Sequence, residues 1–116
     1  MPDELRALTP AGREQARALG EQLASVAPAV VISSPLLRAC ETAAAIARET
    51  SAELRIDDRL APGATLAALL GAAEGLAEPL VAVGHQPDCG EIAAAVTGRE
   101  PPPYPPAGFV ELDLPL

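Results

Sequence analysis

The sequence predicts a three-layer α/β/α sandwich built around a mostly parallel sheet, and three observations predict it. Patterns typical of helices and of strands alternate along the chain. The strand patterns are short and mostly apolar, as expected for parallel strands that are covered on both faces. The length of 116 residues is that of one domain, so we expect residues 1–116 to form a single unit.

The first elements are a helix and a buried strand. Thr9 followed by Pro10 predicts a helix start, with the threonine as N-cap and the proline at the first helical position. Residues 29–33 (AVVIS) form a nearly all-apolar run, which predicts a strand buried on both faces. The chain therefore opens on a helix, although domains of this architecture normally open on a strand.

The next segment repeats these signals. Ser34 and Pro35 again have the cap-and-proline pattern, which predicts a second helix directly after the strand. We expect that helix to carry Leu37, Cys40, Ala44 and Ala47 on one face. Residues 53–57 (ELRID) predict a second strand.

The second half of the chain continues the alternation. Thr65 is expected to cap a third helix, and residues 80–84 (LVAVG) predict the third strand, the most hydrophobic and the most buried of all. Asp88 and Glu91 have the spacing of a capping box for a fourth helix, which is expected to stop at Gly98.

The C-terminal segment is expected to add a loop and a strand. Residues 101–106 are rich in proline and predict a loop, because proline lacks a backbone N–H. Residues 110–114 alternate apolar and acidic side chains, which predicts an edge strand with one wet face. The expected domain therefore has four helices and four strands.

The composition restricts the partners. A net charge of -8 disfavours nucleic acid and anionic membranes, and all eight basic residues are arginine. No stretch approaches the ~20 apolar residues of a membrane span, and the start has no secretory signal, so we expect a cytoplasmic protein. Cys40 and Cys89 match no metal or redox spacing, and we expect both to be reduced, packed thiols.

Arg38 lies in the first or second turn of the helix that follows residues 29–33. A cation at this place opposes the helix dipole, at a cost of about 0.3–1 kcal/mol. An anion between the arginine and the helix end would reverse that effect. Alternatively, Arg38 forms a surface ion pair with Glu41 or Asp57.

His85, the single histidine of the chain, follows the third predicted strand. It can donate to an anion or move a proton near neutral pH, and Gly84 before it allows a close backbone approach. Alternatively, the histidine is satisfied by the local backbone. A parallel sheet brings Arg38 and His85 to one rim, and a guanidinium with a titratable donor is typical of a phosphate site.

Four segments in the right order carry a family resemblance. SSPLLRACETA (33–43) resembles an S-P-x-x-R-A-x-x-T-A motif, and VAVGHQP (81–87) resembles a G-H-x-P motif. DELRALTPAG (3–12) is similar to D-x-x-R-x-L-T-x-x-G, and LAPG (60–63) to an L-x-P-G turn. These motifs are those of the histidine phosphatase superfamily, whose fold is phosphoglycerate mutase-like, and in particular of its short SixA-type phosphohistidine phosphatases.

The resemblance implies a mechanism with two histidines. A first histidine attacks phosphorus and becomes phosphohistidine, which water then hydrolyses. By motif, Arg38 corresponds to the second arginine of the clamp and His85 to the second histidine. Asp3 corresponds to the acid that protonates the leaving group, and Arg6 is expected to help at the rim.

The sequence departs from the family at its start. The R-H-G or R-H-A motif, and the first central strand that carries it, are absent, so we expect a domain truncated at its N-terminus and inactive by itself. Three hypotheses remain open: an active phosphatase whose polypeptide starts upstream, a phosphate-binding pseudo-enzyme, and a decayed fragment or a module completed by a strand of another chain.

Short connections between the motifs predict an open, shallow pocket. Such a pocket suits a phosphohistidine displayed on a protein, or a small phosphomonoester. We expect no cofactor and no metal, because arginines supply the positive charge that Mg²⁺ would otherwise provide.

Overall fold

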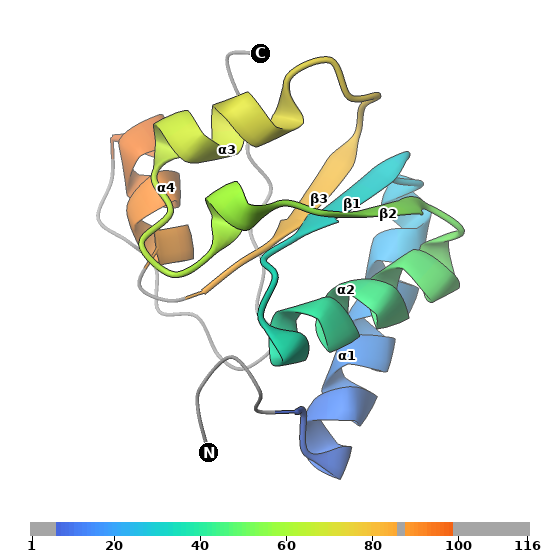
Figure 1. The fold of residues 1–116 in the computed structure, drawn as a ribbon. Helices are drawn as coiled ribbons and strands as arrows, with labels where there is room; N and C mark the ends of the chain where they lie inside the picture. Colours follow the sequence, from blue (N-terminus) through green and yellow to red (C-terminus); the bar gives the residue numbers. More distant parts are fainter. Residues whose placement is uncertain (1–6, 86–87, 99–116) are drawn as a thin grey trace.

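The computed structural model describes residues 7–85 and 88–98 of the chain. Helices and strands alternate along them (Figure 1): α1 (Pro10–Leu23), β1 (Val30–Ser33), α2 (Leu37–Thr50), β2 (Glu53–Ile56), α3 (Leu66–Ala73), β3 (Leu80–Val83) and α4 (Asp88–Thr97). Two short 3-10 turns are added, η2 (Ala24–Val26) and η3 (Asp58–Leu60). The α/β fold class is thereby confirmed, while the expected loop at 101–106 and strand at 110–114 lie outside the described residues.

The three described strands form one parallel sheet in the order β2-β1-β3. Ser33, the last residue of β1, is aligned with Ile56 of β2 and Val83 of β3, so the carboxyl ends of all three strands meet at one edge. None of the described helices is long and apolar enough to span a membrane.

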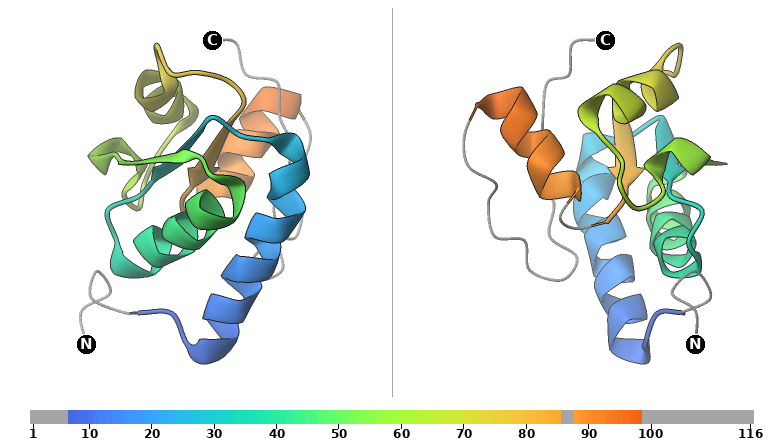
Figure 2. Two further views of the ribbon diagram at one scale, coloured as in Figure 1. Left: turned by 90° about the vertical axis from the view of Figure 1, so that its right-hand side faces the viewer. Right: turned by 60° about the vertical axis from the view of Figure 1, so that its left-hand side comes forward.

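Side chains of β1 divide the core into two halves, because successive residues of a strand point to opposite faces. Val30 and Ile32 pack with Leu60, Leu69, Ala72 and Ile92, which come from η3, α3 and α4. Val31 packs with Leu19, Leu23, Ala43 and Ile46, which come from α1 and α2. The sheet is thus the middle layer between two pairs of helices, as the views in Figures 1 and 2 show.

The prediction that residues 80–84 form the most buried strand is wrong. All four residues of β1 are buried, whereas Leu80, Val81 and Val83 of β3 are partly buried and Ala82 is exposed. The reason is position in the sheet: β1 lies between two strands, and β3 pairs with β1 alone within the described part of the chain.

Two of the expected helix caps are confirmed. Thr9 Oγ1 accepts a hydrogen bond of 3.0 Å from Gly12 N at the start of α1, and Thr65 Oγ1 accepts one of 3.2 Å from Ala68 N at the start of α3. At the other end of the chain, α4 is followed by Gly98 with φ of 72°, a left-handed conformation that glycine adopts without strain and that ends the helix as predicted.

The predicted start of α2 is wrong. The helix begins at Leu37 with Leu36 as N-cap, and Ser34 and Pro35 precede it. Its buried residues are Ala39, Ala43, Ala45 and Ile46, while Leu37 is 40% exposed. Because α2 is rich in alanine on every side, the position of the sheet and of α1, rather than the sequence pattern, decides which face is buried.

Candidate functional site

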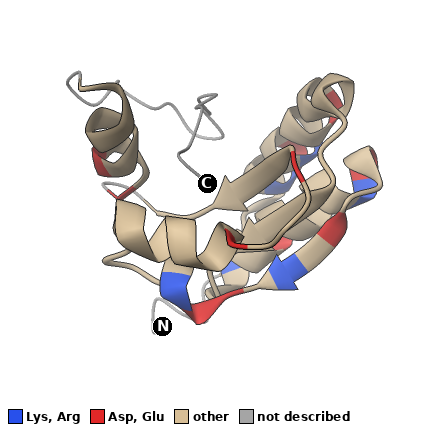
Figure 3. Cartoon of the chain, turned by 90° about the horizontal axis from the view of Figure 1, so that it is seen from above, with Lys and Arg blue, Asp and Glu red and all other residues tan. Residues whose placement is uncertain are grey.

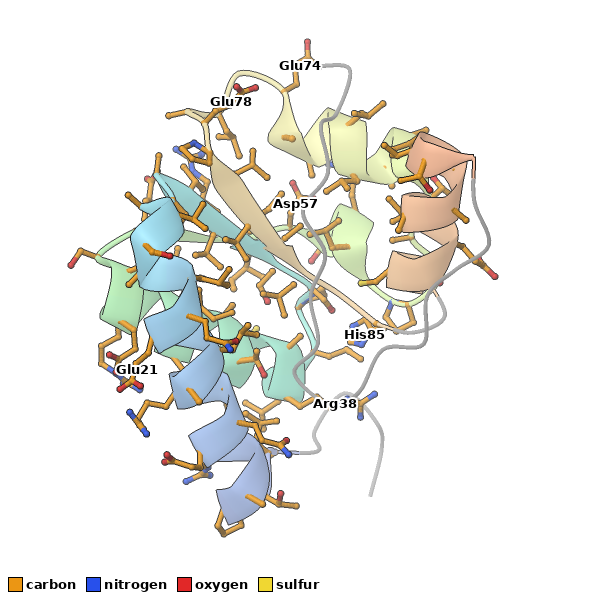
Figure 4. The ribbon with its side chains drawn as sticks, turned by 180° about the vertical axis from the view of Figure 1, so that it is seen from behind. Glu21, Arg38, Asp57, Glu74, Glu78 and His85 are labelled. Atoms are coloured by element: carbon orange, nitrogen blue, oxygen red, sulfur yellow. The ribbon has the colours of Figure 1, made fainter. Side chains whose placement is uncertain are left out.

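The site predicted from sequence lies at the carboxyl edge of the sheet, where backbone bonds hold the strand ends together. Ser34 N donates to Val83 O at 3.0 Å, which joins the segment after β1 to the end of β3. Arg38 lies in the first turn of α2, and His85 lies two residues after β3. Figure 4 shows both labelled side chains at this end of the sheet.

A side-chain contact links the two loops that follow β1 and β3. His85 Nε2 lies 2.6 Å from Ser34 Oγ, and Ser34 is fully buried, with 0% of its surface exposed. The backbone of His85 is fixed as well, because Cys89 N in the first turn of α4 donates to His85 O at 2.9 Å. The segment after β1 therefore holds the imidazole of His85, and α4 holds the backbone of the same residue.

Ser34 lies at this edge, although its sequence pattern predicts a helix cap. Its Oγ accepts from Leu36 N at 3.3 Å, which is the local turn typical of serine rather than a cap of α2. Two consecutive serines at the end of an apolar strand were the available signal. Both Ser33 and Ser34 are fully buried, and buried polar groups need partners.

The N-terminus of α2 contributes positive electrostatic potential to this edge. Leu36 at the N-cap has no side-chain oxygen, and no side chain caps the described helix start. The first N–H groups of a helix carry partial positive charge. Arg38, which is partly buried, adds a full charge in the same turn, so the local field favours an anion.

Both carboxylates considered as ion-pair partners of Arg38 form ion pairs with other arginines. Glu41 lies 3.4 Å from Arg13, and Asp57 lies 2.8 Å from Arg59. Hydrogen bonds from the Arg59 side chain and backbone N–H lower the pKa of Asp57 below its ordinary value. Both carboxylates thus already have an arginine partner.

Asp88 links the loop around His85 to the turn at residues 61–64. Its Oδ2 accepts from Gly63 N at 2.7 Å and from Ala64 N at 3.1 Å, and the residue is 8% exposed. The predicted capping box with Glu91 is thus wrong: Asp88 is the first residue of α4, and its carboxylate binds a distant turn instead.

The two cysteines lie beside this edge and are both free. Cys40 Sγ donates to Ser34 O at 3.3 Å, and burial raises the pKa of the Cys89 thiol above its ordinary value. Within the described part of the chain, His, Cys, Asp and Glu side chains form no group of three that could hold a metal ion.

Charged residues of both signs are interspersed over the described helices and strands (Figure 3). Arg13, Arg17, Arg55 and Arg59 each form ion pairs with Glu or Asp. Of the four residues predicted for the site, the structure thus locates Arg38 and His85. Asp3 and Arg6 lie outside the described residues.

Comparisons with known proteins give a consistent result. The family model described as the histidine phosphatase superfamily (branch 1) matches residues 6–86. No curated protein shows a significant match.

Solved structures that are similar in fold include the following three. The protein histidine phosphatase SixA complexed with tungstate has a TM-score of 0.75 at 23% identity, over 90% of this chain and 72% of that one. SixA from Nakamurella multipartitia has a TM-score of 0.68 at 32% identity, over 79% and 55%. A mycobacterial glucosyl-3-phosphoglycerate phosphatase complexed with VO3 has a TM-score of 0.62 at 26% identity, over 86% and 70%. The chain spans only 55% of the length of the Nakamurella protein.

Proposed function

The chain belongs to the histidine phosphatase superfamily, and from that membership we propose that Ser34, Arg38 and His85 form the rim of a phosphoryl-binding site. The observation that carries the proposal is the 2.6 Å contact between His85 Nε2 and Ser34 Oγ. It joins the loop after β3 to the segment that leads into the helix of Arg38.

In the proposed chemistry, charge stabilisation comes from three sources on this chain. Arg38, the uncapped N–H groups of α2 and His85 hold the oxygens of the phosphoryl group. A histidine nucleophile attacks phosphorus, so that an N–P bond forms while the bond to the leaving group breaks. An acid gives the leaving group a proton, a role that we propose for Asp3, with Arg6 assisting at the rim. Water then attacks phosphorus, and the N–P bond breaks.

The nucleophile is the part that this chain does not supply. The chain has one histidine, and one imidazole cannot both attack phosphorus and stabilise the group it has attacked. We therefore propose that residues 1–116 bind a phosphoryl group but need a nucleophilic histidine from elsewhere for turnover. The alternative is a binding module without turnover, a phosphate-recognising pseudo-phosphatase.

Two kinds of substrate fit the proposal, a phosphohistidine on a protein and a small phosphomonoester. One similar structure is a protein histidine phosphatase and another a sugar-phosphate phosphatase. Both were solved with an oxyanion, tungstate or VO3. The net charge of -8 disfavours nucleic acids and anionic membranes as partners, and we propose a cytoplasmic location.

Calorimetric titration of the chain with tungstate tests the site directly. We expect binding that Arg38→Ala weakens about tenfold or more, which corresponds to ~1.4 kcal/mol, because a charged partner of the anion is lost. Arg48→Ala is the matched control, since Arg48 is exposed in the last turn of the same helix. Equal binding by native chain and Arg38→Ala, or equal losses in both variants, would contradict the proposal.

A phosphorylation assay tests the second half of the proposal. Incubation of the 116-residue chain with phosphohistidine-labelled protein is expected to give no acid-labile phosphoenzyme. A burst of phosphoenzyme that His85→Ala abolishes would make His85 itself the nucleophile. A polypeptide that joins an R-H-G strand to residues 1–116 separates the alternatives: turnover supports the phosphatase, and tungstate binding without turnover supports the pseudo-enzyme.

A further inference from the structure

We infer that Ser34 is a positioning residue that fixes both the orientation and the tautomer of His85. The pair is close, with 2.6 Å between Ser34 Oγ and His85 Nε2, and the serine is fully buried. A buried hydroxyl cannot exchange its partner for water, so its hydrogen bonds are fixed by the protein.

The donors and acceptors around Ser34 decide the direction of the bond. A serine hydroxyl has one proton to donate and lone pairs that accept. Leu36 N–H donates to Ser34 Oγ at 3.3 Å, so the oxygen already accepts there. Its own proton needs an acceptor, and the remaining atom in contact with the hydroxyl, within the described part of the chain, is His85 Nε2. Ser34 therefore donates to Nε2, and the neutral imidazole carries its proton on Nδ1.

The position of the imidazole proton affects anion binding. An imidazole in water favours the tautomer with the proton on Nε2, whereas Ser34 stabilises the opposite one. Nδ1 is then the protonated nitrogen, so the neutral ring has its N–H donor on that side without taking up a further proton. This last step rests on the proposed function, but the tautomer itself does not.

Nitrogen-15 NMR of the native chain tests the tautomer without any variant. Because His85 is the single histidine, the imidazole gives one pair of ring ¹⁵N signals and needs no assignment to a residue. At a pH where the ring is neutral, we expect Nε2, the nitrogen coupled to both ring C–H protons, at the downfield position of an unprotonated nitrogen. Nδ1 is expected at the upfield position of a protonated one. The reverse pattern would overturn the inference whatever the variants do.

Variants then separate positioning from general support. Ser34→Ala is expected to move both ¹⁵N signals toward the Nε2–H pattern, and Ser34→Cys, which keeps a weak donor, to restore part of the native pattern. Ser33→Ala is the matched control: Ser33 is equally buried and its Oγ donates to Ser34 O at 2.8 Å, not to His85. If Ser33→Ala shifts the signals as much as Ser34→Ala, Ser34 has no special role. If Ser34→Ala does not fold, the native spectrum still decides.

Titration with tungstate, followed through the same ¹⁵N signals, connects the tautomer to binding. We expect Ser34→Ala to weaken tungstate binding about tenfold relative to Ser33→Ala, the factor that ~1.4 kcal/mol produces. If the native chain has the Nδ1–H tautomer but does not bind tungstate, the proposed function fails and the role of Ser34 stands. If tungstate binds but the ring has the Nε2–H tautomer, the role of Ser34 fails and the proposed function stands.

Discussion

Asp88 Oδ2 accepts a hydrogen bond from Gly63 N at 2.7 Å, although 25 residues separate the two along the chain. The same oxygen accepts from Ala64 N at 3.1 Å. One carboxylate thus ties the turn before α3 to the start of α4, three residues after His85.

Replacement of Asp88 should therefore loosen the domain at this point. We expect Asp88→Ala to lower the free energy of unfolding by about 1–3 kcal/mol, because the backbone N–H groups of Gly63 and Ala64 both lose their acceptor. Asp88→Asn keeps an oxygen acceptor and is expected to lose less. Urea denaturation measures both, with Glu91→Ala, an exposed position in the same helical turn, as control. If Asp88→Ala lowers the free energy of unfolding no more than Glu91→Ala does, the hydrogen bonds of Asp88 do not stabilise the domain.

At Gly20, α1 lies so close to α2 that there is no room for a side chain. A Cβ at Gly20 would lie 2.9 Å from Glu49 Cβ and 3.2 Å from Ala45 O. We expect Gly20→Ala to destabilise the domain by about 1–3 kcal/mol, because the overpacking outweighs the better helix propensity of alanine.

The control for this substitution is a second helical glycine. At Gly71 the nearest atom to a new Cβ is Arg59 Nη1 at 3.2 Å, the end of a flexible side chain that can move. Gly71→Ala is expected to stabilise α3 by up to about 1 kcal/mol. Thermal unfolding compares the two variants, and a Gly20→Ala protein as stable as Gly71→Ala would show that the helices are not in close contact at Gly20.

The thiol of Cys89 is expected to be unreactive in the folded chain. Burial raises its pKa, so the nucleophilic thiolate is scarce at neutral pH. In a Cys40→Ser background, alkylation of Cys89 by iodoacetamide at pH 8 should be several-fold slower in the folded chain than in urea. Equal rates would mean that the thiol is neither buried nor shifted.

Asp57 gives a pH dependence whose sign follows from its lowered pKa. Its carboxylate is stabilised by Arg59 in the folded chain, so this contribution is present above the unfolded pKa of about 3.9 and is lost as the pH falls through the folded pKa. The difference in Tm between the native chain and Asp57→Asn should be constant from pH 7 to about pH 5 and should shrink below about pH 4. A difference that grows on acidification would contradict the assignment.

The sequence by itself determined the order of helices and strands, the parallel sheet and the caps at Thr9 and Thr65. The patterns that predict these features involve residues close together in the chain. Examples are the apolar run at 29–33 and a threonine hydroxyl that accepts a hydrogen bond from the N–H three residues later. The motifs around Arg38 and His85 also predicted the family, because short motifs are read along the chain.

Only the tertiary structure decided where polar side chains find their partners. Ser34 has the local signal of a cap, yet its hydroxyl contacts His85, 51 residues away, and Asp88 binds a turn rather than its own helix. The burial of β3 and the buried face of α2 likewise depend on which elements lie beside them. A buried polar side chain needs partners inside the protein, and burial is a property of the folded chain rather than of its sequence pattern.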